Sequence, residues 1–369
     1  MKILVTGTRG FIGQNLALQL AEQGHQALAF GRDSDESMLL ALLREADGVC
    51  HLAGANRPRT EIEFEEINCG LTRRLCELAE QTGKILPIVF SSSSQVGENE
   101  SPYARSKQQA EKIVIDYGKR AGVSVKILRL PAVFGKWCRP NYNSVVATFC
   151  HNIANGLQVS IHDASRQLRL IYVDDLVHDL IRMFKNGLTG EIYGTVAPVY
   201  KTTVGELAHD LQEFHRGHDS LMVGDVGLGY HRALYSTYLS YLPTSRFSYR
   251  VPVHRDVRGV FCEMLKTPTS GQISFFTALP GITRGKHYHH SKNEKFLVVK
   301  GRARFRFRQL LTGERHELET SDEQPEIVET IPGWTHDITN VGDAEMVVVL
   351  WANELFDRAN PDTFSIPVE

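Results

Sequence analysis

Two histidines that lie one residue apart, His287 and His289, have the type and spacing of metal ligands. Because residues i and i+2 of a β-strand point to the same face, both imidazoles can converge on one point. Glu294 follows five residues later, and a carboxylate from the next strand would complete a set of donors that zinc and related ions prefer. His336, in a later turn, is the fourth candidate. We therefore predict that these four residues bind a divalent metal, most simply zinc.

This metal has two alternative roles. A divalent ion with an open position would act on a substrate as a Lewis acid. The alternative is a metal that only ties strands together. Four protein ligands without an open position would favour that structural role, since catalytic sites keep one position free. The sequence leaves both roles open.

A tyrosine and a lysine four residues apart form a second group with the spacing for chemistry. On a helix Tyr103 and Lys107 lie on one face, although an exposed surface pair is the alternative interpretation. The ammonium and a nicotinamide charge would lower the pKa of the phenol from about 10 toward working pH. A serine hydroxyl opposite would hold the substrate oxygen. Ser93, third after the last apolar residue of a predicted strand, is our candidate, and Ser92 is the alternative.

A glycine-rich turn near residue 7 predicts a dinucleotide site. Residues 2–5 are a short apolar run typical of a buried parallel strand, and a helical pattern follows the turn. Glycines permit a tight turn and close approach of the backbone to a pyrophosphate at the helix N-terminus. A second small-residue turn follows the third predicted strand. The residues expected to contact the cofactor are Gly7, Thr8, Arg9, Gly10, Phe11, Ile12, Gly13, Leu52, Ala53, Gly54, Tyr103 and Lys107.

The end of the second predicted strand indicates which cofactor is bound. NAD sites usually carry an acid there, which bonds the ribose 2′-hydroxyl and would repel a 2′-phosphate. This sequence has Gly31 and Arg32 at that position, and Arg9 lies in the glycine turn. Two arginines near the 2′-phosphate favour NADPH over NADH. The alternative is that both arginines are solvated surface charges.

The elements that must position these residues fall into two halves. The amino-terminal half alternates buried strands with helical patterns, which predicts an α/β domain of Rossmann type over residues 1–243. From Val251 onward short strands recur with almost no helix, which predicts an all-β jelly-roll domain of residues 244–369. The stretch 227–250 is rich in tyrosine, serine and leucine without a long helical period, and we expect it to pack between the domains.

Composition excludes several functional classes. With 42% hydrophobic residues, 23% charged residues and a net charge of −2, nothing suggests binding to nucleic acid or to an anionic membrane. No apolar run approaches the length of a membrane span. The 6 cysteines lack paired spacing and are expected to be reduced and mostly buried. Because a strand begins at Lys2, we expect no signal peptide and a cytoplasmic protein.

The amino-terminal half resembles the extended short-chain dehydrogenase/reductases that act on nucleotide sugars. The glycine turn, the small-residue turn, the serine-rich strand end and the Tyr103–Lys107 helix carry the resemblance. It implies that Ser93, Tyr103 and Lys107 are catalytic. The segment 169–175 is similar to one that closes over the nucleotide, where an arginine pairs with the sugar diphosphate as a bidentate cation. The substrate contacts implied in this half are Asn141, Asn143 and Arg169.

The carboxy-terminal half resembles the cupins. Residues 281–301 match their first motif, G-x5-H-x-H-x4-E-x6-G, and residues 332–340 resemble the second. Residues 256–263 and 281–288 also resemble the D-x-R-G-x-F-x-E and G-x-x-R-G-x-H-Y segments of the cupin-fold deoxysugar 3,5-epimerases. The substrate contacts implied in this half are Arg258, Glu263 and Arg284.

His287 receives two roles from these resemblances. In the 3,5-epimerases the histidine at this position is the base that removes a proton next to a 4-keto group. A ligated nitrogen has no lone pair for that proton, so one residue cannot readily serve as both ligand and base. We predict that His287 is a ligand, with the base as the alternative. Lys286, Tyr288 or His290 would then move the proton, and Lys286 is our candidate for the catalytic residue.

Over its whole length the chain resembles the bifunctional capsular-polysaccharide and O-antigen enzymes of the CapF/WbjC type, most clearly at residues 135–138, 140–145 and 234–243. The resemblance implies C3 epimerisation of UDP-2-acetamido-2,6-dideoxy-β-L-arabino-hex-4-ulose by the cupin. NADPH-dependent C4 reduction would then give UDP-2-acetamido-2,6-dideoxy-β-L-talose, on the route to UDP-N-acetyl-L-fucosamine for bacterial surface polysaccharide. A homodimer is expected, because both fold families commonly dimerise. The alternatives are a C4-reductase with a structural or dimerising cupin, and a sugar-nucleotide sensor, which would not need Tyr103.

Overall fold

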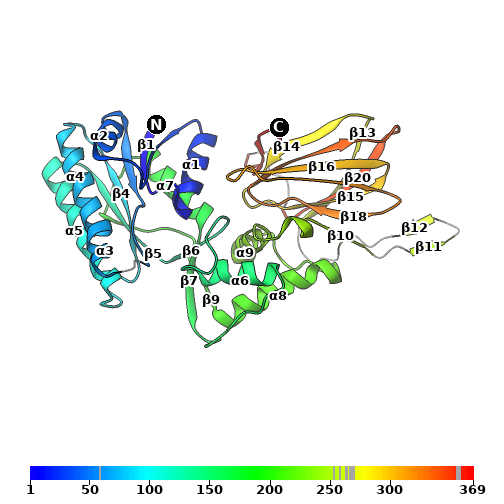
Figure 1. Ribbon diagram of the computed structural model, residues 1–369, viewed down its shortest axis with the longest axis horizontal. Coiled ribbons are helices and arrows are strands. Elements are labelled where there is room, and N and C mark those ends of the chain that lie inside the picture. Colours follow the sequence, from blue (N-terminus) through cyan, green and yellow to red (C-terminus); the bar gives the residue numbers. More distant parts are fainter. Residues whose placement is uncertain (58–59, 252–253, 257–258, 262–264, 266–270, 355–358) are drawn as a thin grey trace. The chain divides into compact units, whose positions relative to one another are not determined.

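Figure 1 shows the chain as a computed structural model, which describes residues 1–57, 60–251, 254–256, 259–261, 265, 271–354 and 359–369. Contacts within the chain divide it into two compact units. Unit 1 comprises residues 1–134, 142–144 and 168–201, and unit 2 comprises residues 135–141, 145–167 and 202–369. The predicted substrate contacts Arg258 and Glu263 lie outside the described residues.

Unit 1 is built on a six-stranded parallel sheet in the order β2-β1-β3-β4-β5-β8. Its strands are β1 (Lys2–Thr6), β2 (Gln26–Phe30), β3 (Gly48–His51), β4 (Ile88–Ser93), β5 (Val125–Leu130) and β8 (Tyr193–Gly194). β3 and β4 are buried along their whole length, as expected of central strands covered on both faces. This sheet confirms the predicted α/β fold of Rossmann type.

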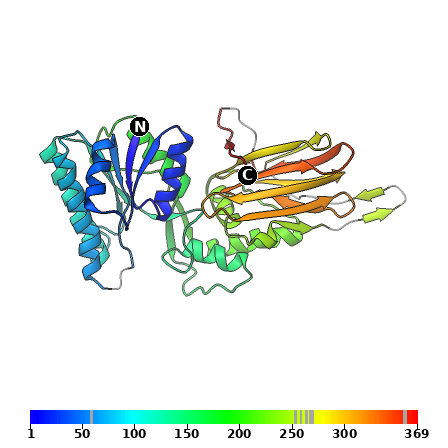
Figure 2. The same cartoon turned by 45° about the horizontal axis from the view of Figure 1, so that its top comes forward.

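Helices cover both faces of this sheet. Figures 1 and 2 show α2, α4 and α5 on one face and α1 and α7 on the other. These helices are α1 (Phe11–Glu22), α2 (Glu36–Glu45), α4 (Leu71–Gln81), α5 (Pro102–Ala121) and α7 (Val173–Lys185). A short α3 (Ile62–Phe64) and the π-helix η1 (Glu65–Gly70) precede α4. Buried side chains such as Leu4, Leu75 and Ile127 fill the layer between sheet and helices.

The parallel strands bring their carboxyl ends to one edge of the sheet. Thr6, His51 and Ser93 are the last residues of β1, β3 and β4, so these three strands deliver them to that edge. In open α/β sheets, ligands bind outside the carboxyl ends of the strands. The residues predicted to bind the cofactor are therefore placed where this fold binds ligands.

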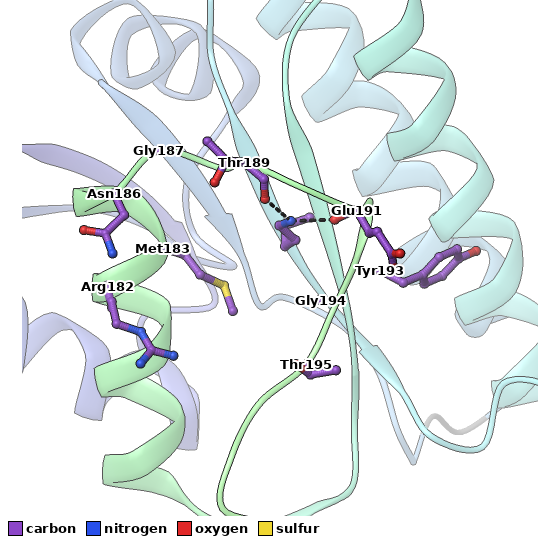
Figure 3. Close-up of a pocket in the computed structure, with 10 residues that line it drawn as sticks. Arg182, Met183, Asn186, Gly187, Thr189, Glu191, Tyr193, Gly194 and Thr195 are labelled. Carbon is purple, nitrogen blue, oxygen red and sulfur yellow. Dashed lines mark hydrogen bonds between the residues drawn. The ribbon is translucent and has the colours of Figure 1, made fainter.

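A hollow of about 300 Å³ lies between the end of α7, the start of β5 and β8 (Figure 3). Lys126 Nζ donates hydrogen bonds there to the carbonyl oxygens of Thr189 and Glu191, at 2.7 and 2.5 Å. These bonds fasten the loop between α7 and β8 to the sheet. The lining of the hollow includes none of the residues predicted to bind the cofactor.

Unit 2 contains two five-stranded antiparallel sheets, in the orders β10-β18-β15-β20-β13 and β17-β16-β19-β14-β21. Their strands are β10 (Ser248–Arg250), β13 (Gln272–Ala278), β14 (Thr283–Tyr288), β15 (Glu294–Lys300), β16 (Arg302–Gln309), β17 (Arg315–Ser321), β18 (Glu326–Glu329), β19 (Trp334–Asn340), β20 (Met346–Ala352) and β21 (Phe364–Ser365). A hairpin of β11 (His254–Asp256) and β12 (Gly259–Phe261) precedes β13. Phe296 and Phe305, from different sheets, have ring centroids 5.7 Å apart, so the sheets share an apolar core. The predicted all-β, cupin-like fold is confirmed.

Unit 2 also contains helices. They are α6 (Val145–Ala154), α8 (Val204–Ser220), α9 (Gly229–Leu239) and the 3₁₀-helix η2 (Thr244–Arg246). A small sheet of β6 (Ala132–Phe134), β7 (Gln167–Tyr172) and β9 (Tyr200–Thr203) lies mostly in unit 1. The sequence shows no long helical period in residues 227–250, yet α9 occupies part of this stretch. Residues 233–239 are all buried, and a helix buried all round has no polar face to produce a period.

Two predictions from composition can be compared with the structure. Cys50, Cys69, Cys76 and Cys150 are buried, as predicted, and form no disulfide within the described part of the chain. Among the described helices, none combines the length and the apolar composition needed to cross a membrane.

Candidate active site and candidate metal centre

The glycine turn brings the start of α1 against the end of β3. Gly7 has a φ of +74°, which favours glycine, and a Cβ there would lie 3.1 Å from the Cα and N atoms of Ala53. A Cβ at Gly13 would lie 2.2 Å from the Gly7 carbonyl oxygen, so α1 packs on the turn only with glycine at this position. The N-cap residue Gly10 has no side chain to bond the first amides of α1. Those amides can therefore bind a pyrophosphate.

A relay of neutral hydrogen bonds fixes the turn after β3. Thr6 Oγ1 accepts from the amides of Leu52 and Ala53, both at 3.1 Å, and lies 2.6 Å from His51 Nδ1. His51 Nε2 lies 2.9 Å from Thr72 Oγ1, a hydroxyl that donates its own proton to a carbonyl. The pattern therefore places the proton of His51 on Nε2. Burial is the main cause that lowers the pKa of His51 to about 3, so the ring is neutral.

Ser93 and Tyr103, which the sequence predicted to act together, lie close enough for the Ser93 side chain to lower the pKa of Tyr103. Ser93 ends β4 and Tyr103 lies in the first turn of α5. Ser92 instead donates a hydrogen bond of 2.5 Å to Glu111, whose carboxylate also binds Arg129 in a bidentate pair. The structure thus brings Ser93, and not Ser92, to the tyrosine.

Lys107 lies one helical turn beyond Tyr103 and is buried. Its Nζ lies 4.5 Å from the centroid of the Phe90 ring, and a Cβ on Gly54 would lie 3.5 Å from it. Burial lowers the pKa of Lys107 to about 8. Burial also raises the pKa of Tyr103, although the Ser93 side chain acts in the other direction. The phenol thus keeps a proton to donate, and the lowering expected with a bound nicotinamide stays a prediction.

Asn68 is a buried site residue that sequence reasoning missed. It lies in η1, where its Oδ1 accepts from the Ala55 amide at 2.8 Å and its Nδ2 donates to the Ala55 carbonyl at 3.1 Å and to Ser106 Oγ at 2.9 Å. A Cβ on Gly54 would lie 3.0 Å from Asn68 Oδ1, so this side chain borders the same turn as Lys107. π-Helical turns are rare and often occur at functional sites. Spacing rules for strands and α-helices do not reveal them.

The arginines that favoured NADPH are exposed near the end of β2. Arg9 forms a 2.5 Å ion pair with Asp33, and both side chains are largely exposed, at 81% and 74%. Arg32 is also exposed. The acid that sequence reasoning did not weigh, Asp33, therefore lies beside the arginine of the glycine turn. An incoming 2′-phosphate would compete with Asp33 for Arg9.

The described substrate contacts that the resemblances implied have exposed side chains. Arg169 lies 3.9 Å from Glu98, with both side chains more than half exposed. Asn143 belongs to unit 1, and Asn141, with a φ of +54°, belongs to unit 2. Arg284, in β14, is exposed too. Among the described contacts, none joins these predicted residues, so their role in substrate binding stays a prediction.

Four side chains of unit 2 converge as predicted for a metal site. The ligand atoms offered by His287, His289, Glu294 and His336 all lie within 4.8 Å of one another. β14 and β19 pair with His287 directly opposite His336, and His289 follows β14. Glu294 comes from β15, which belongs to the facing sheet. The cluster therefore joins the two sheets through their shared interior.

Glu294 carries the negative charge of the cluster. Its Oε2 lies 3.2 Å from His289 Nε2 and 3.7 Å from His336 Nε2, while its Oε1 lies 3.6 Å from Lys292 Nζ. Burial disfavours the charge, but the neighbouring His289 and His336 hold the pKa of the Glu294 carboxyl well below its usual range. The buried Lys292 was not predicted as a site residue, since only the path of the turn after β14 brings it to Glu294.

The chemistry of this donor set fits a divalent ion. Both ring nitrogens of His336 are buried and lack a hydrogen-bond partner within the described part of the chain. Burial, and then the neighbouring imidazoles, lower the pKa of His287 to about 3, so its ring is in the neutral form that binds metals. Imidazole nitrogens with one carboxylate oxygen are donors that zinc accepts in tetrahedral sites.

The three candidates for proton transfer lie in different surroundings. Lys286 is exposed and has a φ of +63° at a β-bulge in β14, a conformation that residues other than glycine rarely adopt. Tyr288 and His290 alternate with the ligand histidines along the chain. Their rings instead pack on Phe364, with centroids 5.5 and 4.9 Å away. Lys286 is therefore the candidate whose side chain is open to a substrate.

Together the fold and the sites define a short-chain dehydrogenase/reductase fused to a cupin. Residues 3–195 match the NAD dependent epimerase/dehydratase family, and residues 254–364 match the polysaccharide biosynthesis C-terminal domain. The chain is 52% identical over 369 residues to UDP-2-acetamido-2,6-beta-L-arabino-hexul-4-ose reductase of Pseudomonas aeruginosa, covering 100% of this chain and 99% of that protein.

Solved structures give the same result. The capsular polysaccharide assembling protein CapF of Staphylococcus aureus matches with 40% identity, full coverage of both chains and a TM-score of 0.69. A structure of CapF with the inhibitor 3-isopropenyl-tropolone matches with 37% identity, full coverage of both chains and a TM-score of 0.64. This chain belongs to the CapF-type family of polysaccharide biosynthesis proteins.

Proposed function

We propose that the chain is a bifunctional enzyme of bacterial surface polysaccharide synthesis. It epimerises C3 of UDP-2-acetamido-2,6-dideoxy-β-L-arabino-hex-4-ulose and reduces C4 of the product to give UDP-2-acetamido-2,6-dideoxy-β-L-talose. The observation that carries the reductase half is the proximity of the Ser93 side chain to Tyr103, with the buried Lys107 one helical turn away. The name of the Pseudomonas aeruginosa relative, a reductase of a UDP-linked 4-ketosugar, supports this substrate class.

Reduction needs a proton as well as a hydride. The glycine turn would hold NADPH, which when bound would supply the hydride for C4 of the sugar. Ser93 orients the ketone oxygen, and Tyr103 gives its proton to that oxygen as the alkoxide forms. The Lys107 ammonium then stabilises the phenolate. Because the Lys107 pKa is about 8, this lysine is charged at neutral pH.

The choice of NADPH rests on Arg9 and Arg32. Both are exposed near the end of β2, where the 2′-phosphate of the cofactor would lie. Asp33 already positions Arg9. A 2′-phosphate that replaces the Asp33 carboxylate would keep the Arg9 guanidinium paired with an anion. NADH has no phosphate for either arginine.

The cupin would supply the epimerase activity. His287, His289, Glu294 and His336 would hold a divalent ion, zinc by its donors. When bound, this ion would supply Lewis-acid chemistry at the sugar ketone. We assign Lys286 to move the proton on C3, because it is exposed and adjacent to a ligand. The inhibitor bound in the related CapF structure is a tropolone, a ring whose adjacent oxygens chelate metal ions, and this supports a metal in the family.

Fusing the two activities gives the pathway a direction. Epimerisation at C3 is close to thermoneutral, whereas hydride transfer removes the ketone that epimerisation requires. Reduction at C4 therefore traps the epimer. We also propose a homodimer in the cytoplasm, as both fold families commonly dimerise, and we keep residues 1–243 and 244–369 as the reductase and epimerase domains.

One experiment on the full chain separates the two activities. In deuterated water with the 4-ketosugar nucleotide, Tyr103→Phe should lower NADPH oxidation by about 10²–10⁴-fold, the usual contribution of a positioned proton donor. Deuterium should still enter at C3. The reciprocal variant, His336→Ala, should lose bound metal and C3 exchange while it still binds NADPH. Unchanged reduction by Tyr103→Phe would contradict the assignment.

A second candidate function is a C4-reductase whose cupin is structural. One observation favours it: four side chains already supply a full tetrahedral set, and Lys292 occupies the remaining carboxylate oxygen. In that case His336→Ala would lose metal and stability together, and the parent enzyme would incorporate no deuterium at C3.

A further inference from the structure

The turn of residues 289–293 joins two of the four metal ligands. His289 opens the turn, Glu294 follows it as the first residue of β15, and Lys292 within it contacts the Glu294 carboxylate. The turn also crosses from one five-stranded sheet to the other. Its conformation therefore sets how the ligands from the two sheets face each other.

Asp362, about seventy positions further along the chain, binds this turn through its side chain. Its carboxylate accepts hydrogen bonds from three successive amides, those of His290 at 3.0 Å, Ser291 at 2.8 Å and Lys292 at 2.6 Å. It also accepts from Ser291 Oγ at 3.1 Å. Charge-assisted bonds of this kind are about twice as strong as neutral ones. One carboxylate therefore holds the turn that carries Lys292 and leads into Glu294.

The backbone of Asp362 acts on the ligand itself. Its carbonyl oxygen lies 2.6 Å from His289 Nδ1, and since a carbonyl can only accept, the ring proton lies on Nδ1. Nε2, which lies 3.2 Å from Glu294, is then the ring nitrogen that faces the cluster and is left to bind a metal. An outer hydrogen bond that fixes the tautomer of a histidine raises its quality as a ligand.

The segment around Asp362 is itself anchored to the ligand strand. β21 pairs with β14 through His287 and Ser365, and the Ile366 amide donates to the Lys286 carbonyl at 3.0 Å. Asp362 has a φ of +39°, a region that non-glycine residues rarely occupy and that persists where surrounding contacts enforce it. Its carboxylate and its carbonyl thereby reach the same turn.

We propose that Asp362 is a positioning residue of the metal centre, which holds the 289–293 turn through its carboxylate and the tautomer of His289 through its carbonyl. The proposal rests on the metal-binding part of the proposed function. It does not require that the metal be catalytic. Removing the carboxylate should leave the four ligands in the chain but release the turn that aligns them.

Zinc affinity of the full chain, measured by competition with a chromogenic chelator and without substrate, tests this. Asp362→Ala should weaken zinc binding by about 10–100-fold, the usual effect of losing an outer-sphere partner. Asp362→Asn should weaken it as well, because one amide oxygen cannot accept from all three amides. Thr363→Ala is the matched control, since the Thr363 hydroxyl bonds only the neighbouring Pro361 carbonyl among the described contacts, at 2.9 Å.

Two further readouts separate a local effect from unfolding. Far-ultraviolet circular dichroism and NADPH binding should be as in the parent, while the absorption bands of bound cobalt(II) should change in intensity. If Asp362→Ala does not fold, the zinc affinity of Asp362→Asn is the test. A zinc affinity that is reduced threefold or more in this variant supports the proposal. Zinc affinity within twofold of the parent in the folded variants overturns it. A parent chain that binds zinc but exchanges no proton at C3 would instead refute the epimerase assignment.

Discussion

The two candidate sites are held by buried polar groups of different kinds. In unit 1 the turn after β3 is fixed by a neutral relay through Thr6, His51 and Thr72. In unit 2 the strand that carries Glu294 is fixed by an ion pair of Lys295 and Glu329, whose side chains are only 3% and 1% exposed. Protonation of His51 would put a charge into the buried relay, and removal of Lys295 would leave the buried Glu329 carboxylate without its cation. Either change would destabilise the folded chain.

This difference also has a topological cause. The relay connects residues at the ends of neighbouring parallel strands, which the sheet already holds together. The ion pair also involves α8, because His218 Nε2 lies 2.9 Å from Glu329 Oε2 while Arg246 lies near His218 Nδ1. Burial lowers the pKa of His218 to about 2, which keeps its ring neutral. The epimerase candidate thus depends on a helix that precedes the cupin match.

Lys295→Met should produce the largest change and tests the ionic half of the comparison. It leaves Glu329 buried without its cation and also removes the 3.0 Å bond from Lys295 to Tyr249. We expect a loss of about 3–5 kcal/mol in unfolding free energy, measured by denaturant titration. Lys300→Met, at the exposed end of the same strand, is the control. A loss below about 1 kcal/mol would show that the pair contributes as little as a surface ion pair.

Acidification should produce the next largest change and tests the neutral half. The pKa of folded His51 is about 3, below its ordinary value of 6.5, so the unfolded chain binds a proton in this window that the folded chain does not. Stability therefore falls as the pH decreases from 6.5 toward 3. The His51 contribution is about 2 kcal/mol at pH 5.

The measurement is the pH dependence of the unfolding free energy between pH 7 and pH 5. His51→Gln should reduce the loss of unfolding free energy over this pH range by about 2 kcal/mol, since glutamine does not titrate. His162→Gln, at an exposed histidine, serves as the control and should leave the slope as in the parent. Equal slopes in the parent and His51→Gln would exclude the relay as a source of acid sensitivity.

Ser236→Ala should have the smallest effect and tests the link from α9 to the metal centre. The buried Ser236 hydroxyl donates to the Ser291 carbonyl at 2.8 Å, in the turn that Asp362 holds. Its loss should cost about 1 kcal/mol, the net value of one hydrogen bond, and weaken zinc binding slightly. Ser240→Ala is the matched control, because Ser240 bonds only within the end of its own helix among the described contacts. Identical zinc affinity and stability in both variants would show that α9 supports the metal centre by packing alone, and not through the Ser236 hydrogen bond.

Much of each site could be predicted because its residues obey local spacing. Ser93 and Tyr103 meet because a strand end and the next helix converge at the sheet edge, and Tyr103 and Lys107 share a helical face. His287 and His289 converge through strand alternation. Asn68 was missed, because a π-helix has no spacing signal, and α9 was missed because burial on all sides removed its period.

The sequence by itself determined the class of both halves, the glycine turn and the pairing of His287 with His289, since backbone geometry fixes how residues two, three or four apart are oriented. The tertiary structure alone decided which residues from distant parts of the chain complete the sites. It brought Glu294 across from the facing sheet, Lys292 to its second oxygen and Asp362 to the turn between them. Such contacts depend on how two sheets pack and where a late segment returns, and no local pattern encodes them.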